Sequence, residues 1–173
     1  MAKIHVLAHM DKNFVRKGDK INAFKTLIGS MGNGNSATSA NKMKAHLHYS
    51  ISEDLTDDQI KKYVKGWKKK QVLKYYIDPR NVNFDKMFGK KMDVGVKGWD
   101  FMQWTGSLFH PGVDVNGIGT YGDQDFGWVF TSPISGTVIH EKRTWFRNGG
   151  WGNLIMIKED EGECRHCPIH CPK

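Results

Sequence analysis

The sequence predicts a mainly β fold with one inserted amphipathic helix. Three observations support this prediction: short stretches alternate or are rich in β-branched residues, glycine-containing turns separate them, and one stretch has the apolar spacing of a helix. With 173 residues, of which 39% are hydrophobic, the chain can bury the core of one ordinary domain and is too short for two. No window approaches the roughly 18 consecutive apolar residues of a membrane span, and the start lacks the apolar stretch of a signal peptide. We therefore expect neither a membrane protein nor a classically secreted precursor.

The first part of the chain contains two predicted strands with a glycine-rich loop between them. In the first strand, residues 3–10, the side chains alternate between Ile4, Val6, Ala8 and Met10 on one face and His5, Leu7 and His9 on the other. A turn at residues 18–20 and an apolar stretch over 21–28 follow, and the small, polar residues 29–41 are expected to form a loop. The second strand, residues 45–51, places His46 and His48 on one face.

A helix and a linker are predicted for the middle of the chain. Thr56 and Gln59 form a capping box, and the apolar residues that follow with helical spacing are Ile60, Tyr63, Val64 and Trp67. This pattern favours an amphipathic helix over residues 57–73, which Asp78 and Pro79 end. Residues 80–98 are expected to be a linker. From Trp99 onward, short strands with glycine turns are predicted at residues 113–115, 128–130, 136–139 and 153–157.

The positive charge of the chain is concentrated in one segment. The formal net charge is +8. Residues 61–91 contain eleven lysines and arginines and two aspartates, a net charge of +9, whereas the rest holds fifteen basic and sixteen acidic residues. Such a charge predicts an anionic partner: nucleic acid, a membrane surface or a bacterial wall polymer. The lysines that would provide the contact are Lys61, Lys62, Lys65, Lys68, Lys69 and Lys70. They form either a solvated helix face or a tether to anionic wall polymer.

The three cysteines, Cys164, Cys167 and Cys171, lie among the last ten residues. Because a disulfide framework would spread them through the chain, the fold does not depend on one. Together with His166 and His170 they could form a small metal site, since Cys-x-x-Cys spacing suits zinc. The other interpretation of residues 161–173 is a disordered tail with reactive thiols.

Several histidines and one carboxylate have the spacing of a hydrolytic metal site. His46 and His48 share one face of a strand, about 6–7 Å apart along the chain. His110 and Asp114 are four residues apart, and His9 lies on another strand. Two histidines and one carboxylate leave a fourth zinc position for water, which is the layout of hydrolytic zinc sites.

The sequences around these residues resemble the lysostaphin/LytM-type peptidoglycan endopeptidases. Residues 109–115 resemble the first zinc motif of that family, and residues 132–138 and 149–157 resemble the family's next two segments. Residues 6–10 resemble its strand with a lone active-site histidine, with Leu7 where tyrosine is usual. Its closing section resembles residues 17–21, 28–34 and 45–51. Together these segments cover roughly 110–120 residues.

The order of the motifs differs from that of the family, in which His-x-x-x-Asp comes first, then the lone histidine, then His-x-His. Joining residue 160 back to residue 2 restores the family order, so the chain looks like a circular permutant whose new ends lie on neighbouring strands. Residues 1–51 would then be the C-terminal half of the peptidase core, 52–98 a helical, basic bridge and linker, and 99–160 the N-terminal half. A fragment of a tandem array, in which two chains complete each other's sites, is the competing explanation.

The resemblance implies a small antiparallel β-sheet or sandwich core, one catalytic zinc ion and a set of roles. His110, Asp114 and His48 would bind the zinc, with water in the fourth position as the nucleophile. His46 would be the general base, and His9 would orient the water or stabilise the oxyanion. Trp151, in the 145–153 loop, would either stack on a peptide or belong to the core. The remaining histidines are taken as structural or incidental: His5, His140, His166 and His170.

We expect an endopeptidase that hydrolyses peptides of the stem or cross-bridge of bacterial peptidoglycan. It would act on the bacterial cell wall, outside the cell or from a virion. One alternative is a metal-binding, wall-associated or structural module without activity. Another is a nucleic-acid-binding protein, in which Trp67, Tyr75 and Tyr76 stack on bases, although no recognised nucleic-acid motif accompanies them.

Overall fold

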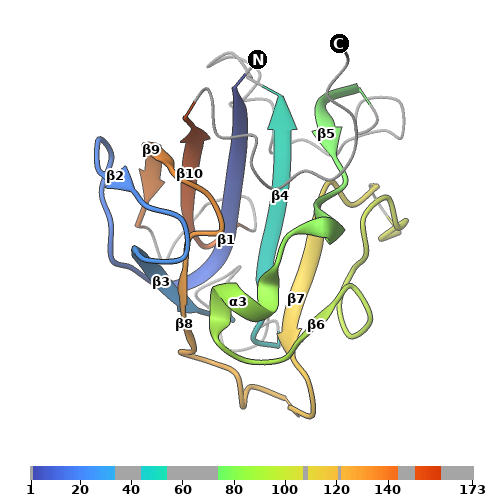
Figure 1. The fold of residues 1–173 in the computed structure, drawn as a ribbon. Helices are drawn as coiled ribbons and strands as arrows, with labels where there is room; N and C mark the ends of the chain where they lie inside the picture. The colour runs from blue at the N-terminus through green and yellow to red at the C-terminus, as the bar shows by residue number, and fades with distance from the viewer. Residues whose placement is uncertain are drawn as a thin grey trace.

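The computed structural model describes residues 2–33, 44–53, 74–106, 109–120, 122–143 and 151–160. These residues form a mainly β fold, as the sequence predicts, whose strands all pair antiparallel (Figure 1). The strands are β1 (Lys3–Asn13), β2 (Lys20–Ile21), β3 (Leu27–Met31), β4 (Leu47–Glu53), β5 (Tyr76–Ile77), β6 (Met92–Val94), β7 (Val113–Gly117), β8 (Val129–Thr131), β9 (Gly136–Lys142) and β10 (Asn153–Glu159). A 3₁₀ turn, η2 (Pro79–Asn81), and the short helix α3 (Phe84–Phe88) complete this part. No helix in the described part is both long and apolar enough to span a membrane.

The main sheet has the order β2-β9-β10-β1-β4-β7-β6, with β1 at its centre. β3 pairs with the far end of β1 and with β8, while β5 pairs with β4. The first and last strands, β1 and β10, lie side by side in Figure 1, with Ile4 opposite Lys158. The two ends of the described chain therefore meet in one antiparallel pair.

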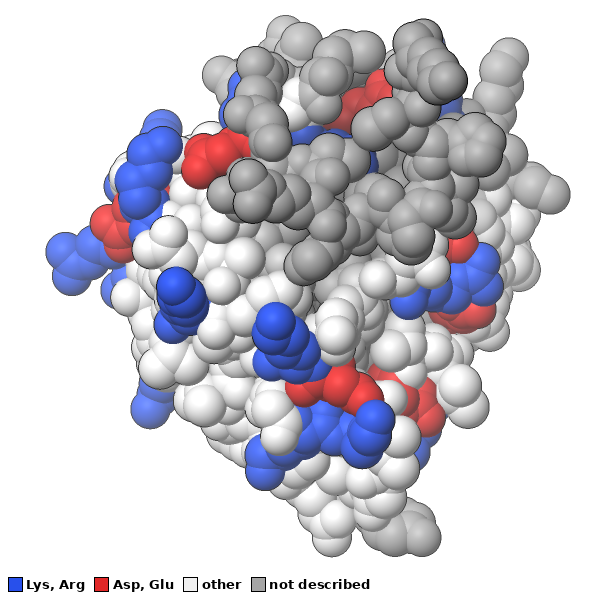
Figure 2. Space-filling model, viewed as in Figure 1, with Lys and Arg blue, Asp and Glu red and all other residues white. Residues whose placement is uncertain are grey.

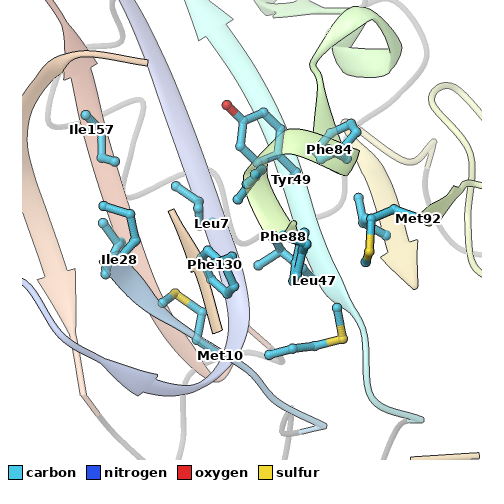
Figure 3. Close-up of a cluster of buried hydrophobic side chains, with 14 of the residues drawn as sticks. Leu7, Met10, Ile28, Leu47, Tyr49, Phe84, Phe88, Met92, Phe130 and Ile157 are labelled. Carbon is cyan, nitrogen blue, oxygen red and sulfur yellow. The ribbon is translucent and has the colours of Figure 1, made fainter. Parts of the chain in front are cut away.

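Both faces of the sheet are covered by apolar side chains. The larger cluster lies on the face that α3, β3 and β8 cover, and Figure 3 shows Phe84 and Phe88 of α3 beside Tyr49 and Leu47 of β4. The rings of Tyr49 and Phe84 meet edge to face, with centroids 5.2 Å apart. On the opposite face a smaller cluster comprises Ile4, Val6, Ala8, Tyr76, Leu154 and Met156. Burial on both faces accounts for the central place of β1.

The alternation of β1 is interrupted by a β-bulge between Leu7 and Met10. His9 has φ = 61°, in the left-handed region, so the alternation reverses after Ala8. Met10 therefore joins the larger cluster with Leu7, and His9 turns to the face of Ala8. The prediction that His5 and His9 face the same way is wrong for this reason. His5 contacts Tyr49 on the other face, with its Nδ1 2.6 Å from the tyrosine hydroxyl.

The prediction that residues 80–98 form a linker is also wrong. Phe84, Met87 and Phe88 have the i, i+3, i+4 spacing of a helix face, and all three are buried in α3. The Asn83 side chain accepts a hydrogen bond from Lys86 N at the start of this helix, and Gly89 ends it with φ = 64°. The segment therefore contributes to the core through α3 and β6.

Residues 29–31 belong to β3 and not to the predicted loop. A Cβ at Gly29 would lie 2.2 Å from the carbonyl oxygen of Lys12, so this glycine allows β3 to approach β1. Several other predictions concern residues outside the described part, where they stay predictions. These are the rest of the loop up to residue 41, the 57–73 helix with its six lysines and Trp67, residues 145–150 and the cysteine-containing tail.

The described charges on the face seen in Figure 2 are scattered, and several lysine and arginine side chains lie beside acidic ones. Within residues 74–91, Lys91 Nζ lies 2.6 Å from Asp85 Oδ2, and Arg80 pairs with Asp78 and Asp100. The cations of this stretch are therefore partly neutralised by neighbouring acids. Exposed pairs of this kind contribute little to stability.

Candidate metal centre

Three neighbouring strands place a row of residues on one face of the sheet. Ala8 of β1 lies opposite His48 of β4, and His48 lies opposite Asp114 of β7. Because paired residues in antiparallel strands share a face, His48 and Asp114 point to the same side. His110 precedes β7 by three residues, and Gly112 allows the connecting turn to pass close to β4: a Cβ there would lie 2.3 Å from the carbonyl oxygen of Tyr49.

The donor atoms of His48, His110 and Asp114 form a compact triangle. His110 Nε2 lies 2.9 Å from His48 Nδ1 and 3.3 Å from Asp114 Oδ1, and His48 Nδ1 lies 3.4 Å from the same oxygen. Ligands that sit about 2.0–2.1 Å from a tetrahedral ion are separated by about 3.3 Å. All three residues are buried, and the group could hold a metal ion, as the sequence predicts.

Backbone groups hold two of these ligands in orientation. His110 Nδ1 lies 3.2 Å from the carbonyl oxygen of Asp100; because a carbonyl only accepts, Nδ1 donates and Nε2 keeps its lone pair for a metal. The N–H of Trp99 donates to Asp114 Oδ2 at 2.9 Å, which leaves Oδ1 to the triangle. Gly98 lies against Asp114, since a Cβ there would be 2.4 Å from the aspartate Cβ.

Burial and mutual contacts set the protonation of the ligands. Burial lowers the pKa of His48 from its usual 6.5 to about 4, because desolvation of the imidazolium outweighs the hydrogen bond to Asp114. Burial alone would raise the pKa of Asp114, but the adjacent imidazoles of His110 and His48 outweigh it and hold that pKa well below its usual value. At neutral pH His48 is therefore neutral and Asp114 is ionised, which are the forms that bind a metal.

Two further histidines lie beside the triangle. His46 Nδ1 is 2.7 Å from the carbonyl oxygen of Lys44, so Nδ1 donates and Nε2 is an acceptor. His46 Nε2 is 3.9 Å from Asp114 Oδ1, is buried, and has no hydrogen-bond partner in the part of the chain that the structure describes. The His9 ring is 4.7 Å from the His46 ring between centroids and 6.0 Å from that of His48.

Trp151 packs over the histidines. Its ring stacks on that of His9, with centroids 6.1 Å apart and 7° between the planes, and it meets His48 edge to face at 4.9 Å. The backbone N–H of His9 donates a hydrogen bond to the backbone carbonyl oxygen of Trp151 at 2.9 Å. Trp151 also packs against the smaller apolar cluster, in agreement with a place in the core, while stacking on a peptide stays a prediction.

The structure thus brings together all five residues predicted for the site: His9, His46, His48, His110 and Asp114. It places His5 on the opposite face and His140 on β9, away from them. Sequence reasoning did not find Trp99, whose contribution is a backbone N–H and leaves no side-chain signal. It also did not find Asn116, although the alternation of β7 places this residue on the same face as Asp114.

A cleft of about 390 Å³ opens beside the candidate metal centre. It is bordered by His46, Asp114 and Asn116, and by Trp99 from the segment between β6 and β7. Lys44 and Lys97 also line it. A molecule in this cleft would lie next to Asp114 of the candidate metal site.

Comparisons of the chain with protein-family models, with curated proteins and with solved structures gave no match.

Proposed function

We propose that the protein is a zinc-dependent endopeptidase that hydrolyses stem or cross-bridge peptides of bacterial peptidoglycan. The observation that carries this proposal is the buried triangle of His110 Nε2, His48 Nδ1 and Asp114 Oδ1, with two further histidines beside it. One carboxylate and two neutral imidazoles suit zinc, which takes nitrogen and oxygen ligands at these separations. A cleft at the edge of the triangle gives a peptide access to it.

The chain supplies the proton transfers of the reaction. Zinc, when bound, polarises the scissile carbonyl and lowers the pKa of water towards 7. His46 Nε2 is the acceptor best placed to take the proton from the attacking water, because its Nδ1–H donates to the Lys44 carbonyl and stabilises the imidazolium that forms. The same imidazolium can then return the proton to the leaving amine. His9 is near enough to His46 to orient the water or to donate to the developing oxyanion.

The proposal includes a circularly permuted LytM-type core. The antiparallel pairing of β1 with β10 supports it, because Ile4 and Lys158 lie opposite each other and a short connection between these strands would restore the family order. The row from Ala8 through His48 to Asp114 also favours one chain over a tandem fragment, since both halves contribute to a single site. An active monomer in sedimentation would support this choice.

The test is the release of new amino termini from purified peptidoglycan. We expect cleavage that a chelator stops and added zinc restores. His48→Ala should lose both zinc and activity, whereas His46→Ala should keep zinc and lose about 10²–10⁴-fold in kcat. His140→Ala, on β9, is the matched control and should retain activity. Cleavage that persists in chelator and in His48→Ala contradicts the proposal, and zinc binding without cleavage favours a non-catalytic module.

A further inference from the structure

The cleft beside the metal centre has a polar lining that the proposed proton transfers do not fully use. One wall consists of Asn116 and Asp114 from β7 and of His46, and the other side carries Lys44, Lys97 and Trp99. Asn116 and His46 are both more than nine-tenths buried. The lining therefore combines the buried hydrogen-bond acceptors of Asn116 and His46 with the positively charged side chains of Lys44 and Lys97.

The charge of this lining is positive. Asp114 is the only acidic residue among the described residues that border the cleft, so with Lys44 and Lys97 the lining has one net positive charge. Lys97 Nζ donates to the carbonyl oxygens of Gly117, at 2.8 Å, and Thr120, at 3.0 Å, which are neutral groups. Lys44 is exposed, and in the described part of the chain its ammonium makes no ion pair. An anionic group of a ligand is therefore favoured here.

Asn116 adds a requirement for a hydrogen-bond donor. Its Nδ2 donates to the carbonyl oxygen of Ala45 at 2.8 Å, which fixes the orientation of the amide. The other atom of the amide, Oδ1, is buried and has no hydrogen-bond partner among the described residues. Because an amide oxygen only accepts, a ligand that satisfies this atom has to bring a hydrogen-bond donor such as an N–H. A phosphate or a nucleic-acid backbone has no N–H group to offer there, whereas a peptide has one at each residue.

We propose that this cleft is the subsite for a peptide residue that carries a free carboxylate. Lys44 pairs with the carboxylate, and Asn116 Oδ1 accepts an N–H of the same peptide segment. Trp99, whose side chain is 38% exposed, provides an apolar wall along the segment. The inference rests on the proposed peptidase function and names its substrate class: acidic peptides with the carboxylate close to the scissile bond.

The test uses two labelled peptidoglycan stem peptides that differ only in whether the glutamate carboxylate is free or amidated. The ratio of kcat/KM for the two peptides measures the preference for the carboxylate. Fluorescence anisotropy measures their binding to the protein without added zinc. Lys44→Gln removes the charge but keeps the backbone carbonyl that orients His46. Lys142→Gln is the matched control, because Lys142 is an exposed lysine on β9 that does not border the cleft.

We expect the wild-type protein to prefer the free carboxylate about tenfold in both measurements, as for one charge-assisted hydrogen bond at an exposed lysine. Lys44→Gln should reduce the preference to less than about twofold, Lys44→Glu should reverse it, and higher salt should weaken it. Lys142→Gln should leave it intact.

Equal kcat/KM for the two peptides, or a preference that survives Lys44→Gln, overturns the subsite while the peptidase function stands. A preference in binding that depends on Lys44, with neither peptide cleaved, supports the subsite and counts against the peptidase function. Equal binding with no cleavage overturns the subsite.

Discussion

Gly98 is the position where the smallest change should disturb the candidate metal centre. A Cβ on this residue would lie 2.4 Å from the Cβ of Asp114 and 2.9 Å from its Oδ2, whereas carbon atoms in contact are normally about 3.5–4.0 Å apart. Gly98→Ala therefore forces a separation of about 1 Å between the loop and the aspartate. The hydrogen bond from the Trp99 N–H to Asp114 Oδ2 is at the point of contact, so the carboxylate cannot keep its orientation.

The size of the effect follows from the tolerance of metal sites. Ligand distances in such sites hold to about 0.2 Å, so a shift of about 1 Å weakens the contribution of Asp114. Loss of the group that orients a ligand typically costs 10–100-fold in metal affinity. With zinc at 100 times the wild-type Kd, binding stabilises the wild type by about 2.7 kcal/mol and raises its Tm by about 5–11 °C. A variant with 100-fold weaker binding should gain only about 1 °C.

The assay is a competition titration with a chromogenic zinc chelator, together with thermal unfolding with and without zinc. Gly89→Ala is the matched control: Gly89 has φ = 64° but no atom near its position for a Cβ, so the variant should lose about 1 kcal/mol of stability and keep its zinc affinity. If Gly98→Ala binds zinc within about twofold of the wild type, Asp114 does not depend on the close approach of Gly98 and the reasoning fails.

Two further predictions concern the stability of the metal-free protein. The pKa of His48 is about 4 in the folded protein and 6.5 in the unfolded chain, so between these pH values the unfolded chain binds a proton that the folded protein does not. The free energy of unfolding therefore falls as the pH drops from 6.5 towards 4, by up to about 3 kcal/mol. Urea unfolding in chelator at pH 7 and pH 5 measures this loss, and equal stability at the two values would refute the assignment. Tyr49→Phe removes the hydroxyl that lies 2.6 Å from His5 Nδ1 in a buried position, and should cost about 1–3 kcal/mol with zinc affinity unchanged. A Tyr49→Phe variant with wild-type urea unfolding would show that His5 does not need this partner.

The parts of the fold that the sequence predicts well are those with strict local alternation. Residues 46–51 alternate throughout, and the structure places Leu47, Tyr49 and Ile51 in the core and His48 on the opposite face. The pairing of His48 with Asp114 is not predictable from such a pattern, because strands far apart in the chain can pair in many registers. For these residues the metal-binding residue types and the family resemblance, and not periodicity, indicated the grouping.

The β-bulge at His9 shows a second limit of periodicity. Period-2 alternation assigns His9 to the face of His5, and only the positive φ of 61° moves it to the face of His48. Histidine adopts positive φ more often than most residues, but such cases are uncommon, so the sequence does not locate the bulge. The site is nevertheless complete only with the bulge, since without it His9 would point into the larger apolar cluster with Leu7.

Close approaches at glycines explain both why residues 29–31 do not form the predicted loop and why the site is compact. Gly29 indicated a loop by its composition, yet it lies in β3, where the nearest atom to a Cβ would be a backbone oxygen of β1. Gly98 lies against Asp114, and Gly112 lies against β4. A side chain at either position would prevent this close approach of the backbone. A glycine required by a turn can be recognised from its neighbours, but a glycine required by a contact depends on residues 16 or more positions away. Gly98→Ala therefore tests whether this absence of side chains, as much as the histidines themselves, defines the metal centre.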